Sequence, residues 1–324
     1  MPRPSTFSRI ADRTSPRLIA LVVAVIAAGC NSPSVTSSPS QSAVPVSPSA
    51  GGSPSAAPSA PPSSPSAVGA IGHKTGGADV VLRIEQGGGF VPIDFLATQA
   101  PGFTLFGDGV IVFQPKVDQF PQPDASGATK GVPWRTAKLD EDQVQDLLEF
   151  ALGPGGLGGA RDSYVEGGIA DAPDTIFTVH AGGIDKTVVV NALSEEPMPG
   201  PDAPIRKAFF RLSSRLQDFD DGGRIPSDVY APERFRAVLI EREAQAGLHP
   251  LTWPWPDLTL ADFPTGPSDG SGPTTFPHRT MALDEVGLLK LDGLEGGLQG
   301  LAIEAPNGTL YGLILRPLLR DETA

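Results

Sequence analysis

The amino-acid sequence predicts an α+β fold whose sheet is mostly antiparallel, built from hairpins and packed with two or three helices. Short apolar runs separated by glycine-rich turns recur along the chain and indicate hairpins. Two segments carry apolar residues at helical spacing. No repeated strand–helix–strand pattern is present, and a parallel sheet would need one. A disordered tether is expected before the folded part.

The first expected strand covers Val80–Glu85, and the first hairpin covers Phe103–Gln114. In the hairpin, two apolar runs flank Gly107-Asp108-Gly109, where glycine can supply the positive φ of a tight turn. A second hairpin is predicted over Thr175–Leu193, with its turn at Gly182-Gly183.

Two helices are predicted between and after these hairpins. Asp140 can cap the first helix, Gln143 completes a capping box, and Gly153-Pro154 ends the helix. Its apolar face comprises Val144, Leu147, Leu148, Ala151 and Leu152. The second helix begins near Asp202, with Pro204 in its first turn. Its buried stripe comprises Ile205, Phe209, Leu212, Leu216 and Phe219.

The last third of the chain is expected to be strand and loop. A strand over Phe235–Glu241 precedes a loop-rich region at Leu248–Pro277 and a short helix near Leu283–Leu289. The final hairpin, Leu301–Leu315, is expected to turn at Asn307-Gly308 through a type I′ turn.

The N-terminus has the features of a bacterial export signal. Four arginines precede the apolar run Leu18–Ala28, whose eleven residues are too few to span about 30 Å of hydrocarbon. Ala27-Ala28-Gly29-Cys30 then resembles the bacterial lipobox. The resemblance implies cleavage before Cys30, attachment of diacylglycerol (with palmitate among the acyl groups) to its thiol, and a membrane-anchored, extracytoplasmic protein. The alternative is an ordinary secretory signal with an incidental cysteine.

The sequence predicts three regions: a signal peptide at 1–29, a lipidated cysteine with a disordered linker at 30–77, and an α+β domain at 78–324. The domain could be divided near 225–250. Of the forty residues Asn31–Ala70, 14 are Ser, 9 Pro and 7 Ala, a composition that cannot bury a core. Cys30 is the only cysteine, so an intramolecular disulfide is excluded.

Four stretches resemble uncharacterised bacterial secreted lipoproteins: Phe103–Gly109, Ala170–Val179, Trp253–Asp257 and Leu315–Glu322. The region 103–193 also resembles a domain-of-unknown-function type with a Gly-Asp-Gly hairpin, a helix and a second hairpin after an Asp-Ala-Pro turn. Some members of that type have a cysteine before the first hairpin, and this chain has none. The resemblance implies an architecture and a location, and it supplies no catalytic residues.

Two glycine motifs match catalytic or cofactor signatures only formally. Gly266–Gly270 fits G-x-S-x-G, but no strand precedes Ser268, as a nucleophile elbow would require. Gly153, Gly155 and Gly158 fit G-x-G-x-x-G, but they follow a helix, whereas a dinucleotide site needs them after a strand. Both are interpreted as loops, and no cofactor is expected.

No metal site is predicted. The four histidines lack ligand spacing. Asp140-Glu141-Asp142 suits the positive end of a helix. Asp218, Asp220 and Asp221 could hold Ca²⁺, but they lack the EF-hand pattern, and a solvated loop is favoured.

Trp253 and Trp255 are the candidate ligand-binding residues. Prolines after each keep the backbone extended, so exposed indoles could stack on a sugar or a peptide. Packing of the indoles against the sheet is the favoured alternative, because large aromatic side chains are usually buried.

The leading hypothesis is a non-enzymatic surface lipoprotein that binds an envelope glycan or peptide. The alternatives are a carboxylate-dependent envelope hydrolase, whose acids the sequence alone does not identify, and a structural envelope component. Without the four arginines and Asp12 of the signal, 20 basic and 36 acidic residues remain, a net charge of −16. Nucleic acid is therefore not an expected partner.

Overall fold

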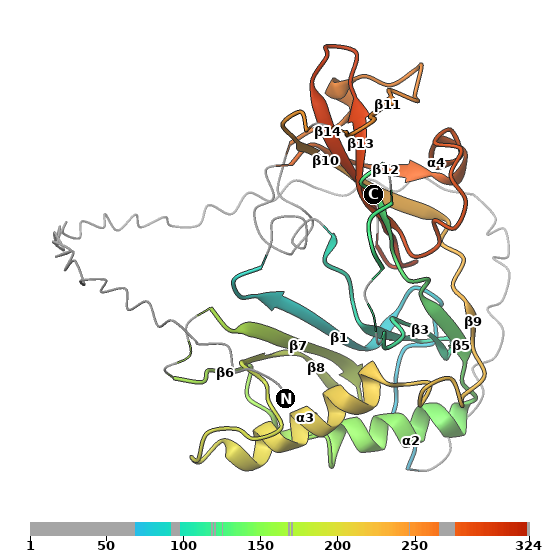
Figure 1. The fold of residues 1–324 in the computed structure, drawn as a ribbon. Helices are drawn as coiled ribbons and strands as arrows, with labels where there is room; N and C mark the ends of the chain where they lie inside the picture. The colour runs from blue at the N-terminus through green and yellow to red at the C-terminus, as the bar shows by residue number, and fades with distance from the viewer. Residues whose placement is uncertain are drawn as a thin grey trace, which may run out of the picture. The chain divides into compact units, whose positions relative to one another are not determined.

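The structure is a computed structural model that describes residues 69–91, 98–117, 119, 121–124, 126–167, 169, 171–245, 247–265 and 276–322. These residues form two sheets of mostly antiparallel strands and three α-helices, which confirms the predicted α+β class (Figure 1). The predicted signal peptide, Cys30 and Ser268 lie outside the described residues.

The first sheet has eight strands. Their order is β6 (Ser163–Tyr164), β8 (Ile184–Asn191), β7 (Pro173–Ala181), β1 (Val80–Gly88), β2 (Phe103–Phe106), β3 (Val110–Phe113), β5 (Arg135–Lys138) and β9 (Asp228–Val229). The hairpins predicted around Gly107-Asp108-Gly109 and Gly182-Gly183 are β2–β3 and β7–β8. Only the two-residue pairing of β6 with β8 is parallel in this sheet.

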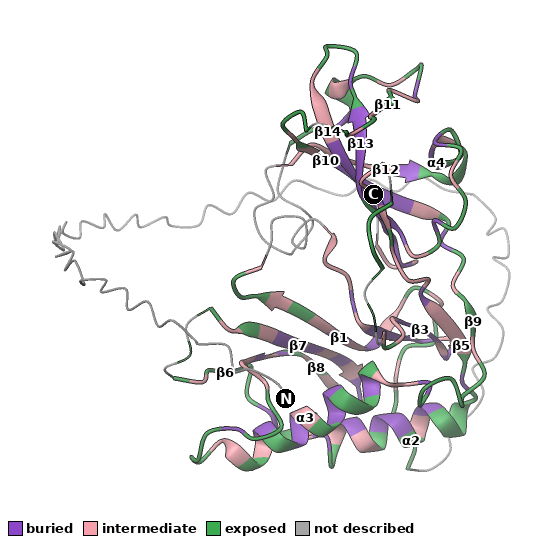
Figure 2. Cartoon of the chain, viewed as in Figure 1, coloured by how far each residue is buried: buried purple, intermediate pink, exposed green. Residues whose placement is uncertain are grey.

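Helices α2 (Glu141–Leu152) and α3 (Ala203–Gln217) lie on one face of the first sheet (Figure 1). The predicted capping box of α2 is present: the Gln143 N–H donates to the Asp140 carboxylate at 2.9 Å, and the Gln143 side chain accepts from the Asp140 N–H. Buried positions recur along both helices and face the sheet (Figure 2). The short 3₁₀ segment Leu157–Gly159 follows α2.

The core between the helices and the first sheet determines which way β1 faces. Leu82 and Ile84 are buried in this core together with Phe177 and Phe209. Successive side chains of a strand alternate between faces. Arg83 and Glu85 therefore point to the opposite face, away from the helices.

The second sheet contains the last strands of the chain. Its order is β11 (Leu251–Thr252), β13 (Leu298–Glu304), β14 (Leu310–Pro317), β10 (Arg234–Glu241) and β12 (His278–Ala282), with β4 (Thr129–Lys130) paired to β13. Helix α4 (Leu283–Gly287) follows β12, and a 3₁₀ turn covers Leu260–Asp262. The strand near Phe235, the short helix and the final hairpin appear where the sequence predicts them.

The type I′ turn predicted for the final hairpin is wrong. The Gly308 N–H donates to Ala305 C=O at 2.8 Å, so the central residues of the turn are Pro306 and Asn307. Only Gly308 has positive φ, at 83°, whereas a type I′ turn needs positive φ at both central residues. Pro306 restricts φ to negative values at the first central position, which favours a type I turn followed by glycine.

Between β3 and β5 of the first sheet, the chain crosses to the second sheet, where β4 pairs with β13. Leu298 pairs with Lys130, and the Gly131 N–H donates to Gly297 C=O at 3.0 Å. A Cβ atom on Gly131 would lie 2.0 Å from the carbonyl oxygen of Gly296, so only glycine fits at this crossing.

Residues before the predicted boundary at Ala78 also contact the first sheet. Ile71 exchanges two hydrogen bonds with the side chain of Gln145, at 2.7 and 3.0 Å. His73 forms an isolated bridge with Ala181. The contacts of the folded part therefore begin several residues before Ala78.

Candidate functional site

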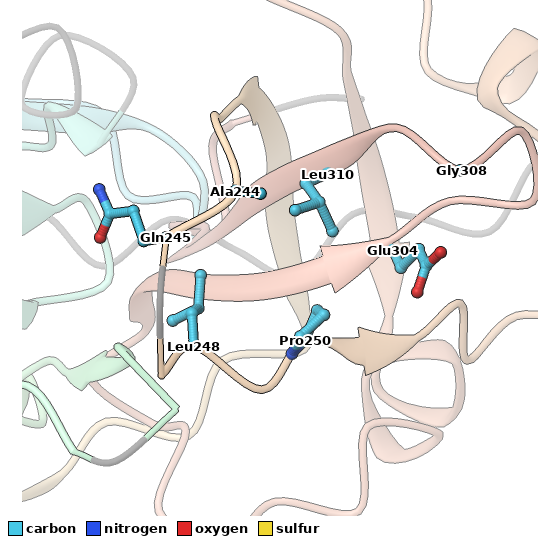
Figure 3. Close-up of a pocket in the computed structure, with 7 residues that line it drawn as sticks. All are labelled: Ala244, Gln245, Leu248, Pro250, Glu304, Gly308 and Leu310. Atoms are coloured by element: carbon cyan, nitrogen blue, oxygen red, sulfur yellow. The ribbon is translucent and has the colours of Figure 1, made fainter.

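The part of the chain that the structure describes contains two cavities of note. The smaller, of about 290 Å³, lies beside the β13–β14 hairpin and is lined by Ala244, Leu248, Pro250 and Leu310 among others (Figure 3). The larger, of about 1000 Å³, is lined by residues of both sheets. Ligand pockets usually measure about 300–1000 Å³, so the larger cavity is the candidate site.

Several elements that are distant in sequence line this cavity. Ile84, Glu85 and Gln86 come from β1, and Gln217 and Asp218 come from the end of α3. The second sheet contributes residues of β13 and β14, namely Leu298, Gln299, Leu315, Arg316 and Pro317. Glu85 reaches the cavity because its neighbours in β1 face the helices.

Side-chain amides and charged groups contribute equally many residues to the polar lining. Five glutamines line the cavity: Gln86, Gln99, Gln114, Gln217 and Gln299. Each amide both donates and accepts hydrogen bonds, as the groups of an uncharged polar ligand do. The charged lining is nearly balanced, with three cations against two carboxylates: Lys116, Lys130, Arg316, Glu85 and Asp218.

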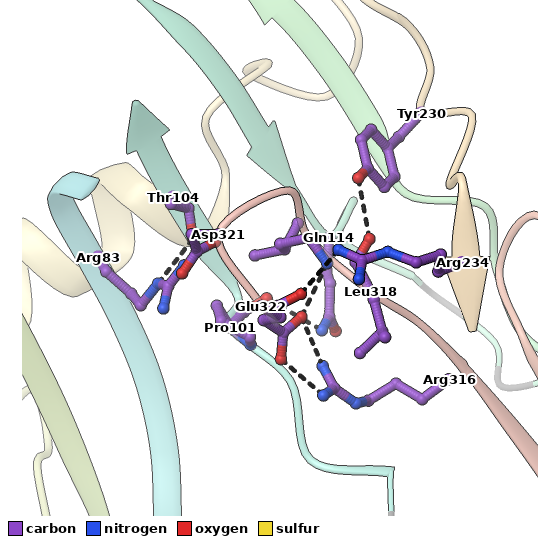
Figure 4. A network of polar contacts seen from close by, with 11 residues as sticks. Arg83, Pro101, Thr104, Gln114, Tyr230, Arg234, Arg316, Leu318, Asp321 and Glu322 are labelled. Atoms are coloured by element: carbon purple, nitrogen blue, oxygen red, sulfur yellow. Dashed lines mark hydrogen bonds and ion pairs between the residues drawn. The ribbon is translucent and has the colours of Figure 1, made fainter. Parts of the chain in front are cut away.

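The segment after β14 is held in place by three arginine–carboxylate pairs, one of which includes Arg316 of the cavity lining. Glu322 accepts from both terminal nitrogens of Arg316, at 3.1 and 2.6 Å, and Asp321 accepts from Arg83 at 2.7 Å (Figure 4). Arg320 donates two hydrogen bonds of 2.9 Å to Asp108, in the Gly-Asp-Gly turn of β2–β3. The last two of these pairs join residues more than 200 positions apart in the chain.

The pairing with Arg320 also lowers the pKa of Asp108. Burial by itself would raise the pKa of this carboxyl, but hydrogen bonds from Arg320 and from the Val110 N–H outweigh burial. The pKa of Asp108 therefore lies below its ordinary value, and the carboxylate form that pairs with Arg320 is favoured.

The pKa of Glu85 is shifted in the opposite direction, above its ordinary value. Burial raises the pKa of its carboxyl; the positive charge of Arg83 opposes this effect, and the negative charges of Glu322 and Asp321 add to it. A carboxyl with a raised pKa in a cavity is a common feature of binding and catalytic sites.

Arg316 has a donor left over in the cavity wall. Its side chain is only 4% exposed, and Glu322 occupies the two terminal nitrogens. The buried Nε–H has no hydrogen-bond acceptor among the described residues. This atom is covered by the surrounding protein and does not face the cavity, so its missing hydrogen bond is a cost in stability and not a ligand contact.

Among the described residues, the one aromatic side chain that lines the cavity is already packed. Trp134 is 6% exposed, and its ring stacks on Tyr230 with a centroid distance of 6.2 Å and an interplanar angle of 18°. The Tyr230 hydroxyl donates to Leu318 C=O at 2.9 Å, and burial raises its pKa to about 12. The pair thus anchors the segment after β14.

Trp253 and Trp255, the two candidate ligand-binding residues, lie in the core of the second sheet. Trp255 is 1% exposed, and its indole N–H donates to Glu285 C=O at 2.8 Å. Trp253 is half-buried, packs edge-on against Trp255 at 5.0 Å, and donates to Leu258 C=O. Trp255 therefore presents no exposed ring face for a sugar or peptide, and neither residue lines the large cavity.

The other motifs can also be located. Gly153, Gly155 and Gly158 follow α2 directly, where the sequence analysis interprets them as a helix stop. Asp218 caps the end of α3, and Asp221 pairs with Arg224 at 2.9 Å on the surface. Among the described residues, no group of three His, Cys, Asp or Glu side chains is arranged to hold a metal ion.

The sequence analysis missed the residues of the cavity. The glutamines are scattered over more than 200 positions, and no spacing connects them. One local signal was available: Arg83 and Glu85 alternate with apolar residues in the otherwise apolar strand Val80–Glu85, so both had to share a face.

No protein-family model, curated protein or solved structure matches this chain. Within the described part of the chain, none of the helices combines the length and the apolar character needed to cross a membrane.

Proposed function

We propose that this chain is a lipid-anchored extracytoplasmic binding protein whose large cavity takes an uncharged polar ligand from the cell envelope. The observation that carries the proposal is the lining of the cavity, which combines five side-chain amides with nearly balanced charge. A strongly charged ligand would leave part of this lining unmatched. A structural component without a ligand would not need such a cavity.

The proposed location rests on the sequence. A basic segment, an apolar run of eleven residues and a small-residue stretch before the only cysteine precede a long Ser/Pro/Ala-rich region. Lipid on Cys30 would hold the protein at the membrane, and the Ser/Pro/Ala-rich region would act as a spacer.

Membrane fractionation tests the anchor. The full-length Cys30→Ser variant is expected in the soluble extracytoplasmic fraction, and the unmodified protein is expected in the membrane fraction. Retention of the variant at the membrane, after its signal is shown to be cleaved, would contradict lipidation at Cys30.

Isothermal titration tests ligand binding. The intact protein in mild detergent is titrated with a muramidase digest of peptidoglycan, which contains both glycan and peptide. Ser214 lines the cavity from α3, and we expect Ser214→Phe to lower the apparent affinity at least about tenfold by filling the space. Lys207→Phe places the same side chain on α3 outside the cavity and is the matched control. An affinity that Ser214→Phe leaves unchanged would place binding elsewhere.

A carboxylate-dependent envelope hydrolase is the second candidate function. Glu85 and Asp218 line the same cavity, and burial raises the pKa of Glu85, as a general acid requires. In this case the intact protein would release new reducing ends or amines from the digest, and Glu85→Gln would reduce that rate by about 10²-fold or more. A digest that stays intact in the presence of the protein would favour the binding function.

A further inference from the structure

The edge of β1 beside the cavity is unpaired over its last residues. β1 pairs with β7 as far as Gly88, but with β2 only as far as Ile84, which lies opposite Phe103. From Glu85 onward, β1 therefore has a neighbouring strand on one side only among the described residues. Glu85 and Gln86 also line the cavity.

Hydrogen bonding shows which backbone groups face the open side. The Ile84 carbonyl accepts from the Gly102 N–H at 2.9 Å, so the backbone groups of Ile84 point toward β2. These groups alternate in direction along an antiparallel strand. The N–H and C=O of Gln86, two residues further on, therefore point to the same side, beyond the end of β2. In the described part of the chain no residue pairs with them there.

The groups around this edge match a polypeptide backbone. Gln99 and Gln299 line the same cavity, and an amide side chain can pair with a peptide group through both of its halves. Donors and acceptors thus surround a strand edge that has one donor and one acceptor of its own.

The same lining is poorly suited to a glycan. Sugar rings usually bind on exposed aromatic faces, which are apolar and flat. Trp134 is 6% exposed and stacked on Tyr230, so it offers no such face in this cavity. A peptide needs no aromatic platform, because its backbone supplies the hydrogen bonds.

We propose that the ligand is an uncharged peptide segment that binds in extended conformation as an added strand beside Gln86. This inference rests on the proposed function, since it names the class of ligand that the cavity takes. Strand addition draws its affinity from main-chain hydrogen bonds and its selectivity from the pockets beside the strand.

The test uses the intact protein in detergent and three probes. The first is a library of acetylated, amidated pentapeptides of uncharged residues, from which bound members are identified by mass spectrometry. The second is the best peptide with single backbone N-methyl groups, and the third is chitohexaose. We expect the peptide to bind, N-methylation at alternate positions to weaken it about tenfold or more, and chitohexaose not to bind.

Two variants at Gln86 give an independent readout. Gln86→Pro removes the N–H that faces the open side, and proline is tolerated at a strand edge where no partner needs that N–H. We expect Gln86→Pro to weaken the peptide at least about tenfold with a small change in melting temperature, and Gln86→Ala to weaken it only about two- to threefold. If Gln86→Pro unfolds the protein, the series of N-methylated peptides alone tests strand addition.

The outcomes separate this inference from the function on which it rests. Binding of chitohexaose, or of the peptide with no effect of N-methylation, overturns strand addition and leaves a ligand-binding cavity. Absence of binding by every probe and by the peptidoglycan digest overturns both. Equal losses in Gln86→Pro and Gln86→Ala would show that the side chain of Gln86, and not its backbone, is the contact.

Discussion

The two sheets of this protein close their cores with different elements. The first sheet is covered by α2 and α3, which are amphipathic and contribute a continuous stripe of buried side chains. The second sheet has a five-residue helix and a proline-rich segment whose Trp255 and Phe263 fill its core. A cluster of three aromatic rings therefore takes the position that helices occupy in the first sheet. Regular secondary structure is one means of burying a sheet face, and a few large side chains are another.

The largest expected effects are in the two cores. Phe209 is fully buried under the first sheet and Trp255 is 1% exposed under the second. We expect Phe209→Ala and Trp255→Ala each to lower the free energy of unfolding by about 3–5 kcal/mol. Denaturant unfolding of the full-length protein, followed by circular dichroism, measures both. A loss below about 1 kcal/mol for Trp255→Ala would mean that the aromatic segment is not equivalent to a helix.

A smaller effect is expected where the two sheets meet. Gly131→Ala would place a methyl group 2.0 Å from the oxygen of Gly296, and such overpacking costs about 1–3 kcal/mol. Gly287→Ala is the matched control, since nothing lies within 4 Å of its added Cβ atom. Equal melting temperatures for the two variants would show that the segment after β4 can shift away from Gly296 at no cost.

The helix caps test the first sheet alone. Asp140→Ala removes a capping box and should cost about 1 kcal/mol. Asp202, before α3, makes no side-chain cap bond and pairs with Arg161 on the surface, so Asp202→Ala should cost less than about 0.5 kcal/mol. Thermal unfolding of both variants measures the difference. A larger loss of stability in Asp202→Ala than in Asp140→Ala would mean that α2 is stabilised by packing and not by its cap.

The smallest effect concerns the carboxyl at the cavity between the sheets. Burial raises the folded-state pKa of Glu85 above its unfolded value, so the folded state holds the proton more tightly. Stability therefore decreases as the pH rises from the unfolded pKa through the folded one. Glu85→Gln removes this loss of stability, because glutamine carries no charge at either pH. The substitution should therefore raise the melting temperature at pH 7 more than at pH 4. A variant with an unchanged pH dependence would show that Glu85 is well solvated.

Local patterns predicted most of the elements, and the reasons are visible in particular residues. Asp140 and Gln143 cap α2 through contacts within four residues, and the glycine turns of β2–β3 and β7–β8 are equally local. The two-residue strands β4 and β9 were not predictable, because each is defined only by its partner in space. The type I′ prediction failed because it neglected Pro306, one residue before the pair considered.

The candidate site was less predictable than the fold. Arg83 meets Asp321 across 238 positions, and Asp108 meets Arg320 across 212. Sequence analysis identified Phe103–Gly109 and Leu315–Glu322 as two separate stretches of the same resemblance, and the structure shows that they contact each other. The tryptophans of the second sheet were conspicuous in the sequence because of their type, whereas the glutamines of the cavity have no local signature.

The position of β4 limits how the gene for such a protein could be divided into separate modules. Thr129 and Lys130 belong by sequence to the half of the chain that builds the first sheet, yet they pair with Leu298 and Gln299 in the second. A gene fragment cut between β9 and β10 would give one product with an unmatched strand and another with an exposed edge on β13. Duplication or exchange of either sheet as a separate module would carry this defect, so recombination should preserve the two sheets together.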